Sequence, residues 1–322
     1  MVYERIIEKV GETPVIQINS NKLSNIDLFA KLEFYNPTGS VKDRASNYLI
    51  NKLLEMNIIN KDTTIIESSS GNFGISLSTY CKHYGLKFYC VIDPLISPIN
   101  EMIIQSLCTA VIKVQEPDSS GGYLLKRIEK VKELVEKIPN SYWVNQYGNL
   151  YNAEAYFYTL GNEIVQEISD IDYLFMGVSS GGTITGVSRK IKEVNPSAKI
   201  IAVDIIGSVI FGGNPQKRHI PGIGSSMVPD ILTHAVIDDV VMVDELTTIN
   251  MCHYLLQEHS VFVGGSSGSV LGAVMKYFAG RNFEKKPKVV VVFPDRGDRY
   301  ASTIYNEEWV HDLKKYFDRV QI

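Results

Sequence analysis

Short runs of apolar and β-branched residues alternate with longer segments of helical periodicity along most of this chain. Eight such runs follow one another, at 26–34, 63–68, 86–93, 110–115, 173–178, 199–204, 240–245 and 288–294. Alternating strands and helices are typical of parallel sheets joined by crossover helices. Several runs, such as the KVVVVF that opens the last one, are apolar on both faces, which indicates strands covered by helices on each side. The sequence therefore predicts an α/β fold.

Helices are expected between these runs. Residues 41–56, 121–137 and 151–168 carry apolar side chains at helical spacing. A parallel α/β chain of 322 residues usually forms two lobes. Its ligands bind where the carboxyl ends of the strands open into a crevice. Functional residues are therefore expected at the ends of the predicted strands.

Composition and charge narrow the range of partners. The chain has 32 Lys and Arg residues and 36 Asp and Glu residues, and the basic residues form no block. A surface that binds nucleic acid or an anionic membrane therefore has little support. The N-terminus is charged and no stretch approaches the roughly 18 apolar residues of a membrane span, so a cytoplasmic protein is expected. The scattered cysteines, Cys81, Cys90, Cys108 and Cys252, are expected to be reduced packing residues rather than metal ligands.

Four polar, glycine-bearing loops are each expected to follow a strand and open a helix. They are NPTGSVKDR at 36–44, ESSSGNFG at 67–74, GVSSGGTITG at 177–186 and VGGSSGSVLG at 263–272. Glycine and serine leave backbone N–H groups free at helix N-termini, where an anion such as phosphate binds well. The spacings of the P-loop and of the dinucleotide-binding motif are absent, so ATP and NAD are poor candidates. A different phosphate-bearing cofactor is expected.

These four loops, in this order, resemble the cysteine synthase and cystathionine β-synthase family of fold-type II pyridoxal-phosphate enzymes. The likeness extends from GETP at 11–14 to PDRGDRY at 294–300. It implies two lobes, each a mainly parallel sheet flanked by helices: a large cofactor-binding domain from 1–44 and 149–322, and a small mobile domain from 45–148. It also implies pyridoxal 5'-phosphate as cofactor, a homodimer, and β-replacement on an activated serine through an aminoacrylate.

The resemblance also assigns roles to single residues. Lys42 matches the Schiff-base lysine, which can later act as the base at the substrate Cα; its neighbour Lys31 has a strand context and is expected to be structural. Asn72 matches the amide that hydrogen-bonds the phenolic oxygen of the cofactor. Ser266 matches the hydroxyl at the pyridine nitrogen, although it could also cap a helix. The phosphate cup corresponds to Ser179, Ser180, Gly181, Gly182 and Thr183.

Candidate substrate-binding residues fall in two regions. In the loop at 67–74, Phe73 stands where cysteine synthases usually carry threonine, so this loop has lost a hydroxyl. Farther along, Arg127 could pair with an acidic substrate group, or could belong to a solvated helix face, and Tyr147 could hydrogen-bond inside the cleft. The loop that receives the substrate α-carboxylate corresponds to Ser69, Ser70 and Gly71, which as an alternative could form only a capped turn.

Five further stretches resemble one branch of this family, the N-(2-amino-2-carboxyethyl)-L-glutamate synthases of staphyloferrin B biosynthesis. The likeness implies L-glutamate as nucleophile, a phosphate or acetate leaving group, and a separate NAD-dependent dehydrogenase that releases 2,3-diaminopropionate. A cysteine synthase that uses sulfide and a non-catalytic homologue are the alternatives. The stretches are EPDSSGGYL at 116–124, NQYGNLYN at 145–152, SRKIKEVNPSAKIIAVD at 188–204, GSVIFGG at 207–213 and PGIGSSMVPDIL at 221–232.

Overall fold

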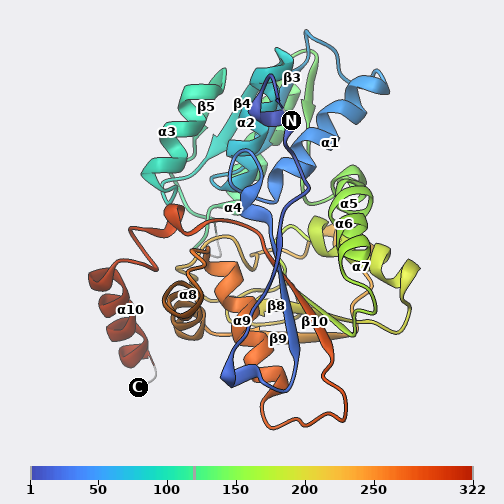
Figure 1. Cartoon of the computed structure of the whole chain (residues 1–322). Helices are drawn as coiled ribbons and strands as arrows, with labels where there is room; N and C mark the ends of the chain where they lie inside the picture. The colour runs from blue at the N-terminus through green and yellow to red at the C-terminus, as the bar shows by residue number, and fades with distance from the viewer. Residues whose placement is uncertain (1, 119–120, 321–322) are drawn as a thin grey trace.

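The computed structural model describes residues 2–118 and 121–320. Its strands form two separate sheets, which lie in the lower and upper parts of Figure 1. Ser119 and Ser120, within the 116–124 stretch, lie outside the described residues.

The larger sheet has the strand order β1-β2-β10-β7-β8-β9 and takes strands from both ends of the chain. Strand β1 is antiparallel to β2, and all other neighbours are parallel. The β10 run of four valines is buried because helices cover both faces of this sheet. Its strands are β1 (Val15–Gln17), β2 (Asp27–Leu32), β7 (Tyr173–Gly177), β8 (Lys199–Ile205), β9 (Asp239–Val243) and β10 (Lys288–Phe293).

The smaller sheet has the order β5-β4-β3-β6, with all neighbours parallel. One face of β4 (Lys87–Ile92) packs into the main core through Phe88 and Cys90. On the other face, Val91 packs against Val131 of helix α4 (Leu124–Lys137). The strands are β3 (Thr64–Ser68), β4 (Lys87–Ile92), β5 (Ala110–Lys113) and β6 (Ser141–Trp143).

Helices connect these strands and cover both sheets (Figure 1). A π-helical turn, η4 (Phe157–Gly161), joins two short helices, and 3₁₀ turns include η3 (Glu33–Tyr35), η5 (Asp230–His234) and η6 (Gly297–Tyr300). The α-helices are α1 (Lys42–Glu55), α2 (Asn72–Tyr84), α3 (Pro98–Leu107), α4 (Leu124–Lys137), α5 (Leu150–Tyr156), α6 (Asn162–Glu167), α7 (Gly182–Val194), α8 (Glu245–His259), α9 (Gly265–Phe278) and α10 (Glu307–Val320).

The predicted α/β class is confirmed, and each of the eight predicted strands is present. One expectation about the loops is wrong. The loop at 263–272 follows helix α8 rather than a strand, and before it Val263 forms only an isolated bridge with Arg296. The other three loops do lie between a strand and a helix.

The state of the cysteines and the length of the apolar helices can both be read from the structure. The four cysteines are free thiols, and all but Cys108 are buried. Within residues 2–118 and 121–320, no helix is long and apolar enough to cross a lipid bilayer.

A buried network of ion pairs joins the start of α1 to β2, η3 and α6. Arg44 Nε lies 2.7 Å from Glu33 Oε2, and Arg44 Nη1 lies 2.6 Å from Glu163 Oε1. Lys31 Nζ lies 3.0 Å from Glu163 Oε2 and 2.6 Å from Glu167 Oε2. The side chains of Lys31, Glu33 and Arg44 are fully buried, so each charge depends on its partners. Lys31 is therefore structural, as its strand context indicates.

Substitution Arg44→Met should destabilise the protein strongly. It leaves the buried carboxylate of Glu33 without its charged partner, which should lower the free energy of unfolding by about 3–5 kcal/mol. Lys126→Met, which removes an exposed ion pair with Glu129, is the control and should have little effect. Urea unfolding followed by circular dichroism measures both. If the two variants lost equal and small amounts of unfolding free energy, the Arg44 network would not have the stabilising role assigned to it.

Candidate active site

Lys42 is the first residue of α1, and the loop before it is held at several points. The Val41 N–H donates to the Pro294 carbonyl at 2.8 Å, which ties the loop to the end of β10. Asp43 accepts hydrogen bonds from the N–H and the hydroxyl of Thr38, each at 2.6 Å, and from the Ser76 hydroxyl of α2 at 2.7 Å. The amine of Lys42 is thus attached to a fixed backbone.

Burial changes the acidity of the Lys42 amine. Desolvation disfavours the ammonium form and lowers the pKa of Lys42 to about 8, while the nearby negative charge of Asp295 opposes this shift. About one tenth of the amine is therefore uncharged at pH 7, far more than for an ordinary lysine. An uncharged amine can attack an aldehyde and can accept a proton.

The loop between β3 and α2 turns tightly around Ser69. The Ser69 hydroxyl accepts hydrogen bonds from the N–H groups of Gly71 at 3.3 Å and Gly74 at 2.9 Å. A Cβ on Gly71 would meet no atom within 4 Å, so this side of the loop is open. The Phe73 ring is instead only 2% exposed and belongs to the core. Of the two, Gly71 borders the open space and the Phe73 side chain does not.

Arg127 is packed against this loop. Its Nη1 donates to the Ser70 hydroxyl at 2.9 Å and lies 3.0 Å from Asp93 Oδ2, and Ser70 in turn donates to Asp93 at 2.7 Å. The Arg127 side chain is 13% exposed, so it does not form part of a solvated helix face. Its buried Nε has no hydrogen-bond partner among the described residues. The guanidinium therefore ties Arg127 to this loop through Ser70 and Asp93.

A buried carboxylate supports the same loop from behind. Glu67 accepts hydrogen bonds from the Ser68 N–H at 2.6 Å, the Trp143 indole at 3.2 Å and the Gln146 N–H at 3.1 Å. Burial raises the pKa of Glu67 to about 7, although these hydrogen bonds and the charge of Arg127 oppose the rise. Glu67 therefore joins β3 to the segment after β6.

The loop between β7 and α7 requires glycine at two consecutive positions. Gly181 has φ +83°, in the left-handed region that disfavours a side chain. A Cβ on Gly182 would lie 2.5 Å from the amide nitrogen of Asn152. Gly181 and Gly182 therefore place no side chain of their own over the first N–H groups of α7, which suits anion binding.

Three hydroxyl-bearing residues lie in this loop and in the first turn of α7. Ser179 donates to the Gly224 carbonyl at 3.1 Å, Ser180 is buried, and Thr183 lies in the first turn of α7. Tyr147 is held beside the loop because its carbonyl accepts from the N–H of Ile231 at 3.0 Å, and the side chain of Ile231 packs over Gly181.

Ser266 lies at the same end of the large sheet as this loop. It occupies the first turn of α9 and is buried. A Cβ on Gly177, the last residue of β7, would lie 3.6 Å from the Cβ of Ser266. Ser266 therefore lies beside the end of the strand that leads into the Ser179–Thr183 loop.

Asn72, the first residue of α2, is linked to the Lys42 side of the site by Asp295. Its Nδ2 donates to Asp295 Oδ2 at 2.7 Å, and Arg299 donates to its Oδ1. The charge of Asp295 also acts on Lys42. Neither Asp295 nor Arg299 is among the site residues predicted from the sequence, although both lie within the PDRGDRY segment at 294–300.

Arg218 is a third residue near the site that was not predicted from the sequence. Its Nη2 donates to the Ser226 hydroxyl at 3.1 Å, whereas its buried Nη1 has no partner among the described residues. A Cβ on Gly224 would lie 2.9 Å from this Nη1, which places Arg218 beside the backbone that Ser179 contacts. Burial raises the pKa of Tyr147, and the charges of Arg127 and Arg218 oppose that rise.

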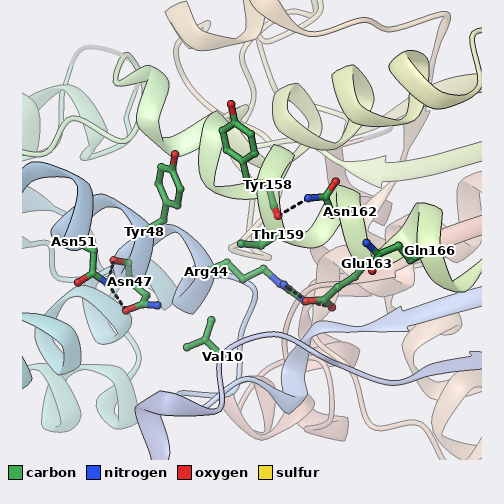
Figure 2. Close-up of a pocket in the computed structure, with 10 residues that line it drawn as sticks. All are labelled: Val10, Arg44, Asn47, Tyr48, Asn51, Tyr158, Thr159, Asn162, Glu163 and Gln166. Atoms are coloured by element: carbon green, nitrogen blue, oxygen red, sulfur yellow. Dashed lines mark hydrogen bonds and ion pairs between the residues drawn. The ribbon is translucent and has the colours of Figure 1, made fainter. Parts of the chain in front are cut away.

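A cavity of about 420 Å³ lies on a different face of α1 (Figure 2). Its walls include Arg44, Asn47, Tyr48 and Asn51. Because an α-helix turns about 100° per residue, this face points away from Lys42. The cavity is therefore separate from the candidate active site.

The site residues fit an aldehyde cofactor that carries a phosphate. A lysine amine with a lowered pKa can bond to the aldehyde. The glycine-lined terminus of α7, with its hydroxyls, can bind the phosphate dianion, and the terminus of α2 offers an open surface beside Gly71 for a carboxylate. Fold and site together define a two-sheet α/β enzyme centred on a lysine.

Comparison with known proteins identifies the family. A family model described as pyridoxal-phosphate dependent enzyme matches residues 6–295. The chain belongs to this family, whose members bind pyridoxal phosphate, and to its fold-type II enzymes of the cysteine synthase and cystathionine β-synthase type.

Solved structures of this type superpose over nearly the whole chain. The O-acetylserine-dependent cystathionine β-synthase of Helicobacter pylori is 36% identical, with a TM-score of 0.87 over 95% of this chain and 100% of that one. A hydrogen sulfide-producing enzyme, solved as a mutant with an α-aminoacrylate intermediate, is 34% identical, with a TM-score of 0.85 over 93% of this chain and 91% of that one. O-ureido-L-serine synthase is 25% identical, with a TM-score of 0.85 over 95% and 96%.

The reactivity of Lys42 in cofactor-free protein should reveal its lowered pKa. Only the neutral amine is nucleophilic, so its labelling rate should rise with pH to a midpoint near 8; a model lysine amide should show a midpoint of about 10.4. Asp295→Asn removes the charge that raises the pKa of Lys42 and should move the midpoint lower still. Pulse labelling and mass spectrometry of the Lys42 peptide measure both. A midpoint equal to that of the model amide would contradict the assigned burial.

Proposed function

We propose that this enzyme carries out β-replacement on an activated L-serine, with O-phospho-L-serine as the favoured donor and L-glutamate as the nucleophile. The product is N-(2-amino-2-carboxyethyl)-L-glutamate, a precursor of 2,3-diaminopropionate in siderophore biosynthesis. The proposal is supported by the resemblance of five segments to the synthases of this compound. It also places a separate NAD-dependent dehydrogenase after this enzyme, to oxidise the product.

In this proposal the cofactor site is built from the ends of four helices. Bound pyridoxal phosphate supplies the electron sink that makes the Cα proton of an attached amino acid acidic. Lys42 binds the cofactor aldehyde, removes the Cα proton and later returns it. Asn72 hydrogen-bonds the phenolic oxygen, and Ser266 hydrogen-bonds the pyridine nitrogen. The phosphate is held by Ser179, Ser180, Gly181, Gly182 and Thr183.

Ser266 favours loss of a group from Cβ over a long-lived carbanion. A serine hydroxyl, unlike a carboxylate, does not keep the pyridine nitrogen protonated, so the ring withdraws electrons less strongly. The electron pair released at Cα then forms a double bond between Cα and Cβ, and the bonding pair of the Cβ–O bond leaves with the phosphate of the donor. Ser69, Ser70 and Gly71 bind the α-carboxylate of the donor through the N-terminus of α2.

The observation that carries the choice of acidic substrates is the arginine charge around Tyr147. Arg127 and Arg218 each have a buried guanidinium nitrogen without a partner among the described residues, and both charges act on the Tyr147 phenol. Arg127 is already paired with Asp93, so Arg218 is the cation that favours a substrate with additional negative charge, as O-phosphoserine and glutamate have and sulfide does not. Tyr147 and Arg127 are the proposed substrate contacts. The core position of the Phe73 ring leaves only its backbone for such a contact.

We also propose that residues 45–148 move as a small domain against 1–44 and 149–322. This segment contains the small sheet and the loop proposed to bind the substrate carboxylate. Closure of the small domain on a bound amino acid would exclude water from the reactive Cβ and prevent hydrolysis.

A product assay tests the reaction directly. Holoenzyme should form the adduct from O-phosphoserine and glutamate. It should form cysteine more slowly when sulfide replaces glutamate, with O-phosphoserine or with O-acetylserine as donor. Lys42→Ala should reduce turnover by at least about 100-fold, because it removes the proposed base. Lys52→Ala, in the same helix, is the control. Chromatography coupled to mass spectrometry measures the products, with O-acetylserine as the alternative donor. Efficient cysteine formation without any glutamate adduct would favour the cysteine synthase alternative.

We further propose a homodimer that uses the face formed by α1, α5 and η4. The Tyr48 and Tyr158 rings stack at 6.3 Å between centroids, and the Tyr151 hydroxyl lies 3.1 Å from the Met56 sulfur. Tyr158, Met56 and Leu150 are nevertheless large exposed side chains. An apolar surface of this kind, beside the cavity of Figure 2, is suited to a second copy of the chain.

Substitution Tyr158→Glu should weaken this dimer. It places a charge in the middle of the proposed interface, and its burial would be unfavourable. Val194→Glu, at a similarly exposed residue at the end of α7, is the control. Light scattering during gel filtration measures the mass of both variants and of the unmodified protein, whose expected mass is twice 36.1 kDa. A dimer that resists Tyr158→Glu would exclude this face.

A further inference from the structure

Asn72 is held between two charged side chains that come from the far end of the sequence. Its Nδ2 donates to Asp295 at 2.7 Å, and Arg299 Nη1 donates to its Oδ1. Arg299 also donates through Nη2 to the Thr38 carbonyl in the loop before Lys42. Arg299 therefore contacts both Asn72 and the loop that carries the Schiff-base lysine of the proposed function.

The two charges dictate which way the Asn72 amide faces. A guanidinium can only donate hydrogen bonds and a carboxylate can only accept them. The amide oxygen must therefore face Arg299, and the amide nitrogen must face Asp295. A flipped amide would place donor against donor and acceptor against acceptor. The nitrogen has two hydrogens and makes one hydrogen bond within the described residues, so one N–H is left for a ligand.

Asp295 has little freedom to move. Its side chain is 1% exposed, and its Oδ2 also accepts from the Tyr300 hydroxyl at 2.8 Å. A Cβ on Gly264 would lie 2.1 Å from the other oxygen, so the carboxylate packs directly on that glycine. Burial raises the pKa of Asp295, whereas its hydrogen bonds from Asn72 and Tyr300 and the charge of Arg299 lower it. The acceptor for Asn72 is therefore held in one place.

We propose that Arg299 and Asp295 are positioning residues that fix the Asn72 amide with its free N–H available to the phenolic oxygen of pyridoxal phosphate. The inference rests on the role of Asn72 in the proposed function. A flipped Asn72 would present its carbonyl oxygen to the phenolate, and two acceptors repel each other. Arg299 thus acts on the cofactor through Asn72 rather than by touching it.

A double-mutant cycle between Asn72 and Arg299 tests this proposal. The readouts are the dissociation constant of pyridoxal phosphate and the visible absorbance spectrum of the bound cofactor, in Asn72→Ala, Arg299→Gln, the double variant and unmodified protein. Arg299→Gln should weaken cofactor binding by about tenfold or more and change the spectrum, because it removes a charged hydrogen bond. In the Asn72→Ala background the same substitution should have no further effect.

Two further variants keep the test decisive. Arg299→Lys retains the charge but lacks the forked pair of donors, so it should give an intermediate effect if Arg299→Gln does not fold. Arg296→Gln, in the same loop and exposed to solvent, is the matched control and should change neither readout.

The outcomes separate this inference from the proposed function. An effect of Arg299→Gln that persists at full size in the Asn72→Ala background would overturn the inference, since it would show a role independent of Asn72. The inference would also be overturned if Arg299→Gln left cofactor binding and the spectrum unchanged while Asn72→Ala clearly changed them. If Asn72→Ala itself changes neither readout, the role of Asn72 in the proposed function fails, and the inference fails with it.

Discussion

The site depends on the desolvation of one amine at the start of a helix. Lys42 can be a nucleophile and base because burial lowers its pKa to about 8, and Asp295 limits that shift. The surrounding structure maintains both the burial of the Lys42 amine and its distance from Asp295. The Asp43 hydrogen bonds fix the backbone of Lys42, and the Val41 contact with Pro294 brings the loop to the β10 end that precedes Asp295. A small change in either contact would alter the distance between the amine and its counter-charge.

Parallel sheets bring the other groups to this amine. The helix termini of α2 and α7 begin directly beyond β3 and β7, so their free N–H groups lie at the carboxyl edges of the two sheets. Helix α9 is preceded in the chain by helix α8 rather than by a strand. Its N-terminus nevertheless lies at the same edge of the large sheet and places Ser266 beside the end of β7. Backbone direction thus accounts for the position of the candidate site.

Much of the fold could be predicted from the sequence because buried parallel strands are apolar on both faces, as the valines of β10 are. Strands β1 and β6 were not predicted because each has only three residues and little apolar pattern. Lys42 and Asn72 could be found because they stand in distinctive loops. Asp295 and Arg299 could not, since DRGDR has the composition of an exposed charged turn, and only the folded chain brings it to Asn72, 223 and 227 residues away.

The N-terminal segment passes over the upper lobe before it enters the lower sheet as β1 (Figure 1). Arg5 lies 2.9 Å from His83 of α2, whereas α10, near the other end of the chain, packs through Leu313 into the core of the lower lobe. Near the N-terminus the chain therefore contacts the lobe that holds the small sheet, although residues 1–44 as a whole are proposed to belong to the large domain, whereas α10 belongs to the other lobe. Fluorophores joined close to the two chain ends would form a donor and acceptor pair whose energy transfer reports whether this N-terminal contact moves with the small domain, without any label inside the candidate active site.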